Sequence, residues 1–149
     1  MALERGYISQ TFEVPSMKPI VLYFSRTGNT KLFAEAISQL FKAPVFDIAS
    51  SQASIVEDYD MVILGTPVEG SSPAKEARAF VESLPQAQGR KVALFVTYRL
   101  FGNERTMKAL EKILAGKGYT TILKVSKKVK TKGVPIDFSE ALEEIKKFV

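Results

Sequence analysis

The chain has 149 residues and a net charge of +5; 46% of the residues are hydrophobic and 25% are charged, which predicts one globular domain with its own core. The absence of Cys and His excludes thiolate nucleophiles, imidazole bases, iron–sulfur clusters and ordinary zinc sites. We therefore predict no catalytic side chain and no metal site, and any chemistry would come from a bound cofactor. With no membrane-length apolar run and no signal-peptide pattern, we expect a cytoplasmic protein.

Residues 1–17 precede the first clear pattern of regular structure. Apolar and polar residues alternate over residues 8–14, which is typical of an additional edge strand. The alternative is an extension before an internal start at Met17, and the sequence leaves both open. The domain itself is predicted to comprise residues 18–149.

The rest of the chain alternates between strand and helix patterns. Short apolar runs predict buried parallel strands, and apolar residues recurring every three or four positions predict helices. This alternation predicts an α/β fold, a doubly wound five-stranded parallel sheet with helices on both faces. Strands are expected at residues 20–24, 44–48, 61–64, 92–96 and 121–125, and helices around residues 32–41, 77–84, 107–114 and 138–148.

Two of these helices carry capping signals. Ser72 followed by Pro73 predicts an N-cap and a first helical residue for the second helix. Asp137, with Glu140 three residues later, predicts a capping box at the start of the last helix.

A polar turn links the first strand directly to the first helix. Backbone N–H groups at such a turn, together with the helix dipole, favour an anion, and Gly28 permits a positive φ. Neither GxxxxGK[ST] nor GxGxxG occurs, so the turn is of neither the P-loop nor the Rossmann type. We interpret it as a phosphate site; the alternative is a plain turn capped by Asn29 or Thr30. Its residues are Ser25, Arg26, Thr27, Gly28, Asn29 and Thr30.

Two further loops follow the strands that end near residues 65 and 96. In open parallel sheets, ligands lie beyond the carboxyl ends of the strands, where the strand order reverses. Either loop alone could be an ordinary turn, but together with the polar turn they indicate a flat ligand that carries a phosphate. The second loop contains Thr66, Pro67, Val68, Glu69 and Gly70, and the third contains Thr97, Tyr98, Arg99 and Gly102.

The three loops resemble those of the flavodoxin family. Residues 25–30 fit its FMN-phosphate pattern Ser/Thr-x-Thr-Gly-Asn-Thr, and the other two loops are similar to its second and third flavin loops. The resemblance covers residues 18–149 and implies a flavodoxin-like sheet of order 2-1-3-4-5 with non-covalently bound FMN. It further implies that residues 25–30 hold the phosphate and that residues 66–70 and 97–102 enclose the isoalloxazine.

The family resemblance implies a carrier of single electrons between redox proteins. Two alternatives remain open, a small FMN-dependent NAD(P)H:quinone-type reductase and a flavin-free binding module on the same fold. The second loop departs from many relatives, because Glu69 stands near the position of an aromatic that stacks on the flavin. Tyr98, and after it Phe101, are then the stacking candidates, although Tyr98 could equally end a strand over the core.

The positive charge is a second departure, because flavodoxins are typically acidic. Residues 117–132 contain six lysines and no acidic residue. They predict either a docking surface for an acidic redox protein or a solvated strand edge that resists pairing. Nucleic acid is not expected, because no recognition motif accompanies the lysines. The six are Lys117, Lys124, Lys127, Lys128, Lys130 and Lys132.

Overall fold

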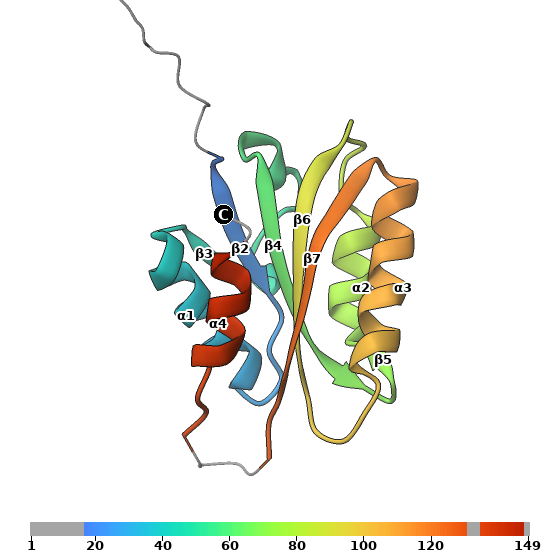
Figure 1. Cartoon of the computed structure of the whole chain (residues 1–149). Coiled ribbons are helices and arrows are strands. Elements are labelled where there is room, and N and C mark those ends of the chain that lie inside the picture. Colours follow the sequence, from blue (N-terminus) through green and yellow to red (C-terminus); the bar gives the residue numbers. More distant parts are fainter. Residues whose placement is uncertain (1–16, 131–134, 148–149) are drawn as a thin grey trace, which may run out of the picture.

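The computed structural model describes residues 17–130 and 135–147. Five parallel strands form its central sheet in the order β3–β2–β4–β6–β7, which in chain order is 2-1-3-4-5 (Figure 1). The predicted doubly wound sheet and its strand order are thereby confirmed. The strands are β2 (Pro19–Tyr23), β3 (Val45–Asp47), β4 (Met61–Glu69), β6 (Arg90–Tyr98) and β7 (Tyr119–Lys128).

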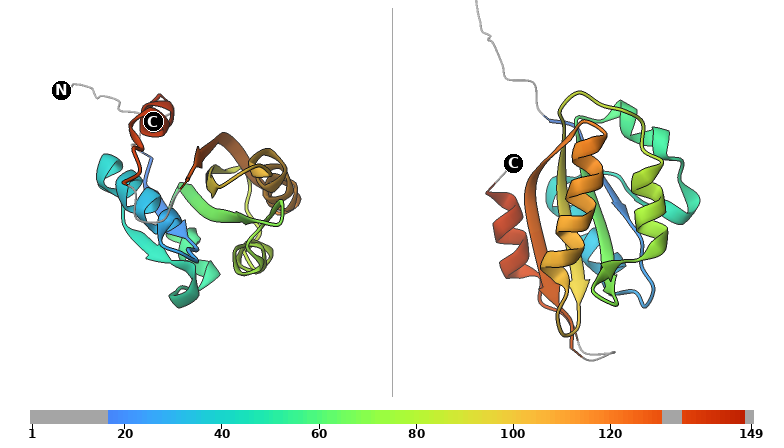
Figure 2. Two further views of the ribbon diagram at one scale, coloured as in Figure 1. Left: turned by 90° about the horizontal axis from the view of Figure 1, so that it is seen from below. Right: turned by 90° about the vertical axis from the view of Figure 1, so that its right-hand side faces the viewer.

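Helices cover both faces of this sheet, as the end-on view in Figure 2 shows. α1 (Asn29–Phe41) and α4 (Ser139–Lys146) lie on one face, and α2 (Lys75–Glu82) and α3 (Asn103–Gly116) lie on the other. Successive side chains of a strand point to opposite faces, so Ile63 packs in the first layer and Leu64 in the second. Burial on both faces explains why the strands read as continuous apolar runs. In the described part of the chain, no helix is long and apolar enough to cross a membrane.

The connection from β3 to β4 contains two short 3-10 helices, η1 (Ile48–Ser50) and η2 (Ala53–Asp58). The sequence analysis predicted neither of them. The Asp47 carboxylate accepts a hydrogen bond from the Ala49 N–H at 2.8 Å at the start of η1. Val56 in η2 is fully buried, so this tight connection covers the α2 side of the sheet with little chain.

The start of α2 differs from the prediction, because Ser72 and Pro73 form a short strand, β5 (Ser72–Pro73), and not a helix start. β4 runs past residue 64 to Glu69, and β5 pairs with its end in antiparallel fashion. Gly70 and Ser71 form the two-residue turn with φ of 58° and 64°, and positive φ at both central positions is the signature of a type I′ hairpin. The helix starts only after this hairpin, at Lys75.

The predicted capping box at the last helix does not form, because Phe138 is the N-cap and the Asp137 side chain closes a local turn two residues along the chain instead. The Asp137 carboxylate accepts hydrogen bonds from the Ser139 N–H at 2.9 Å and from the Ser139 hydroxyl at 2.6 Å. These two bonds lower the pKa of Asp137. Among the described residues, Glu140 makes no return hydrogen bond to the backbone, and Phe138 is the N-cap. The predicted strand at residues 8–14 and Lys132 lie outside the described residues.

Candidate functional site

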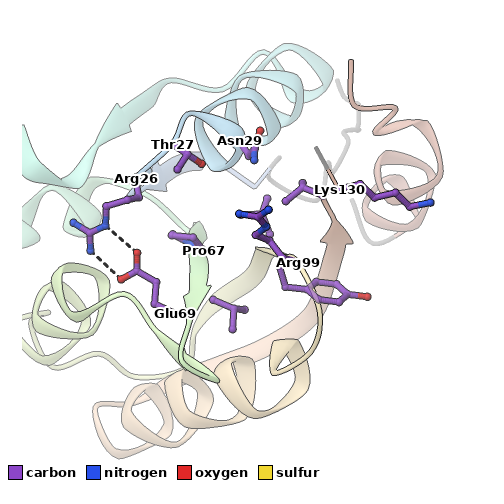
Figure 3. A pocket seen from close by; sticks show the side chains of 11 residues that line it. Arg26, Thr27, Asn29, Pro67, Glu69, Arg99 and Lys130 are labelled. Atoms are coloured by element: carbon purple, nitrogen blue, oxygen red, sulfur yellow. Dashed lines mark hydrogen bonds and ion pairs between the residues drawn. The ribbon is translucent and has the colours of Figure 1, made fainter. Parts of the chain in front are cut away.

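A cavity of about 250 Å³ opens at the carboxyl edge of the sheet, where the order reverses between β2 and β4 (Figure 3). Parallel sheets place ligands at this edge, and all three predicted loops meet there. Nine predicted residues line the cavity: Arg26, Thr27, Asn29, Pro67, Val68, Glu69, Thr97, Tyr98 and Arg99. The other predicted residues do not line the cavity: Thr30 lies in the first turn of α1, Thr66 lies in β4, and Ser25, Gly28, Gly70 and Gly102 lie in the turns at this edge.

The turn after β2 presents backbone donors at the start of α1. Gly28 has a φ of 102° and is the N-cap of this helix. The Ser25 hydroxyl accepts hydrogen bonds from the Gly28 N–H at 3.1 Å and the Lys31 N–H at 3.2 Å. Within residues 17–130 and 135–147, the N–H groups of Thr27, Asn29 and Thr30 have no acceptor. Three free donors at the positive end of a helix form an arrangement that binds anions.

Three predicted threonines, Thr30, Thr97 and Thr66, use their hydroxyls within the protein. Thr30 is buried, and its hydroxyl is hydrogen-bonded to that of Thr97 at 2.7 Å, which ties α1 to the end of β6. Thr66 is fully buried; its hydroxyl accepts from the Ala74 N–H at 3.1 Å and donates to the Pro67 carbonyl at 2.9 Å. These hydroxyls therefore hold the wall of the cavity in place.

The Arg26 side chain points out of the predicted phosphate loop, residues 25–30, and toward the hairpin formed by β4 and β5. Its guanidinium donates two hydrogen bonds to Glu69 and two to Glu76, all at 2.9 Å, and Figure 3 shows the pair with Glu69. These bonds raise the pKa of Arg26 and lower the pKa of Glu76. The phosphate contact of Arg26 stays a prediction, and its side chain is engaged by Glu69 and Glu76 instead.

The end of β7 contributes two lining residues that the sequence analysis missed, Val129 and Lys130. The predicted strand stopped at residue 125, whereas the ladder continues along β6 to Lys128. The Val129 N–H then donates to the Tyr98 carbonyl at 2.7 Å. Val125 and Val129 are separated by an even number of positions, so both point to the same face of an extended strand. This spacing was the sequence signal for the longer strand. Lys130 adds a third cation to the lining, after Arg26 and Arg99. Figure 3 shows the Arg99 side chain directed toward residues 27–29 of the turn after β2.

The third loop packs closely on the hairpin turn. Gly102 is the N-cap of α3 with a φ of 95°, and a Cβ on it would lie 2.7 Å from the Ser71 Cα. Between β6 and Gly102, Leu100 and Phe101 point to solvent, with 77% and 70% of their surface exposed. Of the two stacking candidates, only Tyr98 lines the cavity.

The five lysines of this group that the structure describes do not form one face. Lys117 donates to the Leu84 carbonyl at 2.8 Å, and Lys124 pairs with Glu111 at 2.9 Å. A strand rises by about 3.3 Å per residue, so β7 separates Lys117 widely from the cavity. Lys127 lies beside the glutamates of α4, and Lys128 is paired in register with Tyr98. Of the five described lysines in residues 117–132, Lys127, Lys128 and Lys130 are those near the carboxyl edge.

Comparisons with known proteins agree with this geometry. The flavodoxin domain family matches residues 20–134. A flavodoxin from Megasphaera elsdenii is 30% identical over 110 residues, which cover 68% of this chain and 80% of that protein. The chain belongs to the flavodoxin family. Flavodoxins are FMN-containing electron-transfer proteins that work with redox partners.

Two solved flavodoxin structures are similar to this one. The two-electron reduced flavodoxin of Megasphaera elsdenii has a TM-score of 0.70 and 25% identity, over 85% of this chain and 96% of that chain. The flavodoxin of Streptococcus pneumonia TIGR4 has a TM-score of 0.71 and 16% identity, over 87% and 93%. The cavity of this flavodoxin also suits the family cofactor, because free N–H donors at one side and apolar Pro67 and Val68 at another fit a phosphate and a flat ring.

Proposed function

We propose that this flavodoxin holds one FMN in the cavity at the carboxyl edge and passes single electrons between redox proteins. The observation that carries the proposal is that, among the described residues, the N–H groups of Thr27, Asn29 and Thr30 have no acceptor, beside a cavity that Pro67 and Val68 line with apolar surface. A phosphate satisfies these donors, and the redox chemistry belongs to the flavin that the phosphate anchors.

The chain's own residues bind and orient this cofactor. The side chains of Thr27 and Asn29 add neutral donors to the phosphate site, and Tyr98 offers an aromatic face to the ring. Pro67 and Val68 exclude water from one wall of the cavity. Arg99 adds positive charge at the lining, which favours an anionic ligand.

Titration of the purified chain with FMN tests the proposal. We expect saturation at one FMN per chain, with quenched flavin fluorescence and a shifted absorption band, because the ring leaves water for an apolar wall. Riboflavin should bind more weakly. A chain that leaves the FMN spectrum unchanged at micromolar protein would point to a flavin-free binding module instead.

The reductase alternative is favoured by one feature, because Glu69 takes the place of an aromatic and leaves the ring more open. We expect the FMN-loaded protein to give no sustained turnover of a quinone with NAD(P)H alone. Steady turnover under these conditions would favour the reductase.

We further propose that the carboxyl edge docks an acidic redox protein. Leu100 and Phe101 offer exposed apolar surface there, and Arg99, Lys128 and Lys130 offer exposed positive charge. A partner with an acidic rim complements this edge and would approach the cavity directly.

Replacing Lys128 and Lys130 by Gln should slow electron exchange with an acidic ferredoxin-like protein, because both are exposed at this edge and exposed charges act mainly on the association rate. In stopped-flow experiments the wild-type rate should fall as salt rises, since charges are screened beyond about 8 Å at physiological salt. The variant should be nearly independent of salt. The matched control replaces Lys91 and Lys112, which are exposed away from this edge, and a wild-type rate that does not respond to salt would contradict the docking proposal.

A further inference from the structure

Arg26 links three separate parts of the site. It belongs to the turn after β2, but its side chain reaches Glu69 at the end of β4 and Glu76 in the first turn of α2. Its four hydrogen bonds to these carboxylates measure 2.9 Å. The carbon at the centre of the guanidinium also lies 4.7 Å from the centre of the Phe24 ring.

This arrangement depends on the shape of the guanidinium. Its planar fork binds two carboxylates at once and stacks on an aromatic ring, whereas the ammonium of a lysine is a single point charge. The Arg26 side chain keeps 44% of its surface exposed, and each glutamate side chain keeps 35%. Ion pairs with this degree of exposure contribute little to the free energy of unfolding. The main consequence of these contacts is therefore that they fix the positions of the elements they join.

The position that Arg26 fixes is that of the β4–β5 hairpin relative to the phosphate loop. Glu69 is the last residue of β4 and lines the cavity, and in Figure 3 its carboxylate points to Arg26. Without that partner, the Glu69 charge would be uncompensated at the cavity wall. A negative charge there disfavours each added electron on a nearby ring.

We infer that Arg26 is a positioning residue: it clamps the hairpin to the phosphate loop and compensates part of the Glu69 charge, and thereby tunes the potential of the bound cofactor. The potential part of this inference rests on the proposed function, whereas the clamp is a property of the chain alone. The two parts are therefore tested on different forms of the protein.

The clamp is tested by hydrogen exchange over residues 66–76 in the full chain without FMN. Arg26→Gln and Arg26→Lys should both speed exchange there at least threefold, because lysine keeps the charge but loses the fork. Arg78→Gln is the matched control, since Arg78 is an exposed arginine on α2 that pairs with Glu82. Wild-type exchange in Arg26→Lys, or equal acceleration in Arg78→Gln, would overturn the clamp.

The potential is tested by redox titration of the FMN-loaded proteins. Arg26→Gln should lower the midpoint potential for the second electron by about 59 mV, which corresponds to a tenfold change in the equilibrium constant of a one-electron couple. Arg26→Lys should give less than half of that shift, because lysine keeps a positive charge near Glu69, and adding Glu69→Gln to Arg26→Gln should restore the wild-type value. Wild-type potentials in Arg26→Gln would overturn the inference. A wild-type chain that fails to bind FMN would overturn the proposed function, while exchange over residues 66–76 would still decide the clamp.

Discussion

Replacing both Thr27 and Asn29 by Ala is expected to weaken FMN binding by two to four orders of magnitude and riboflavin binding by less than threefold. Both side chains line the cavity beside the free N–H donors. A hydrogen bond to a charged group contributes about 1.5–3 kcal/mol, and about 1.4 kcal/mol corresponds to a factor of ten in affinity. Riboflavin has no phosphate and does not make these contacts.

Fluorescence titration of each variant with both ligands provides the comparison. Thr120→Ala is a suitable control, because Thr120 is exposed on β7. Thr30 is left unchanged, since its hydroxyl bonds to Thr97 and its loss would mix a folding effect into the binding result. Equal losses of affinity for FMN and riboflavin would show that this turn does not bind the phosphate.

Gly102→Ala is the second change with a large expected effect, and it should weaken FMN and riboflavin binding alike. An added Cβ would lie 2.7 Å from the Ser71 Cα, so the third loop and the hairpin must separate. The positive φ costs about 1–2 kcal/mol, and the overpacked contact adds about 1–3 kcal/mol. We therefore expect the free energy of unfolding to fall by several kcal/mol.

The control for this substitution is Gly89→Ala. Gly89 also has a positive φ, of 84°, but an added Cβ would meet no atom within 4 Å. In denaturant unfolding, the free energy of unfolding of Gly89→Ala should fall only by the cost of the positive φ, about 1–2 kcal/mol. Its affinities for FMN and riboflavin should be unchanged. If Gly102→Ala behaves like Gly89→Ala in both measurements, the loop and the hairpin turn do not depend on their close contact.

The strands and helices could be predicted because burial on both faces of the sheet leaves continuous apolar runs with helical periods between them. The phosphate loop could be predicted for a similar reason, since residues 25–30 are contiguous and lead straight into α1. The edge at which three loops meet follows from the general position of ligands on such sheets.

The hairpin at residues 68–73 could not be predicted in the same way. Ser72 followed by Pro73 is also a good helix start, and only the positive φ at both Gly70 and Ser71 decides for a turn. A serine is rarely expected in that conformation. The ordinary signal for a type I′ turn, Asn-Gly or Asp-Gly, is absent here.

The role of the Arg26 side chain depends on contacts between distant positions. Glu69 lies 43 residues away and Glu76 lies 50 residues away, so no local pattern reveals the clamp. For the same reason, the sequence did not show which of the lysines in residues 117–132 are already paired within the protein. Lys124 pairs with Glu111 on α3, which is visible only after the helix has packed beside β7.

The most direct test of phosphate binding at the start of α1 is an NMR titration of the isotope-labelled chain. We predict that FMN shifts the backbone N–H resonances of Thr27, Asn29 and Thr30 downfield, because these free donors gain a phosphate acceptor. Inorganic phosphate should shift the same three resonances weakly, and riboflavin should leave them in place while it shifts Tyr98. Equal shifts with riboflavin and FMN at these three residues, or no shift with FMN, would contradict the account.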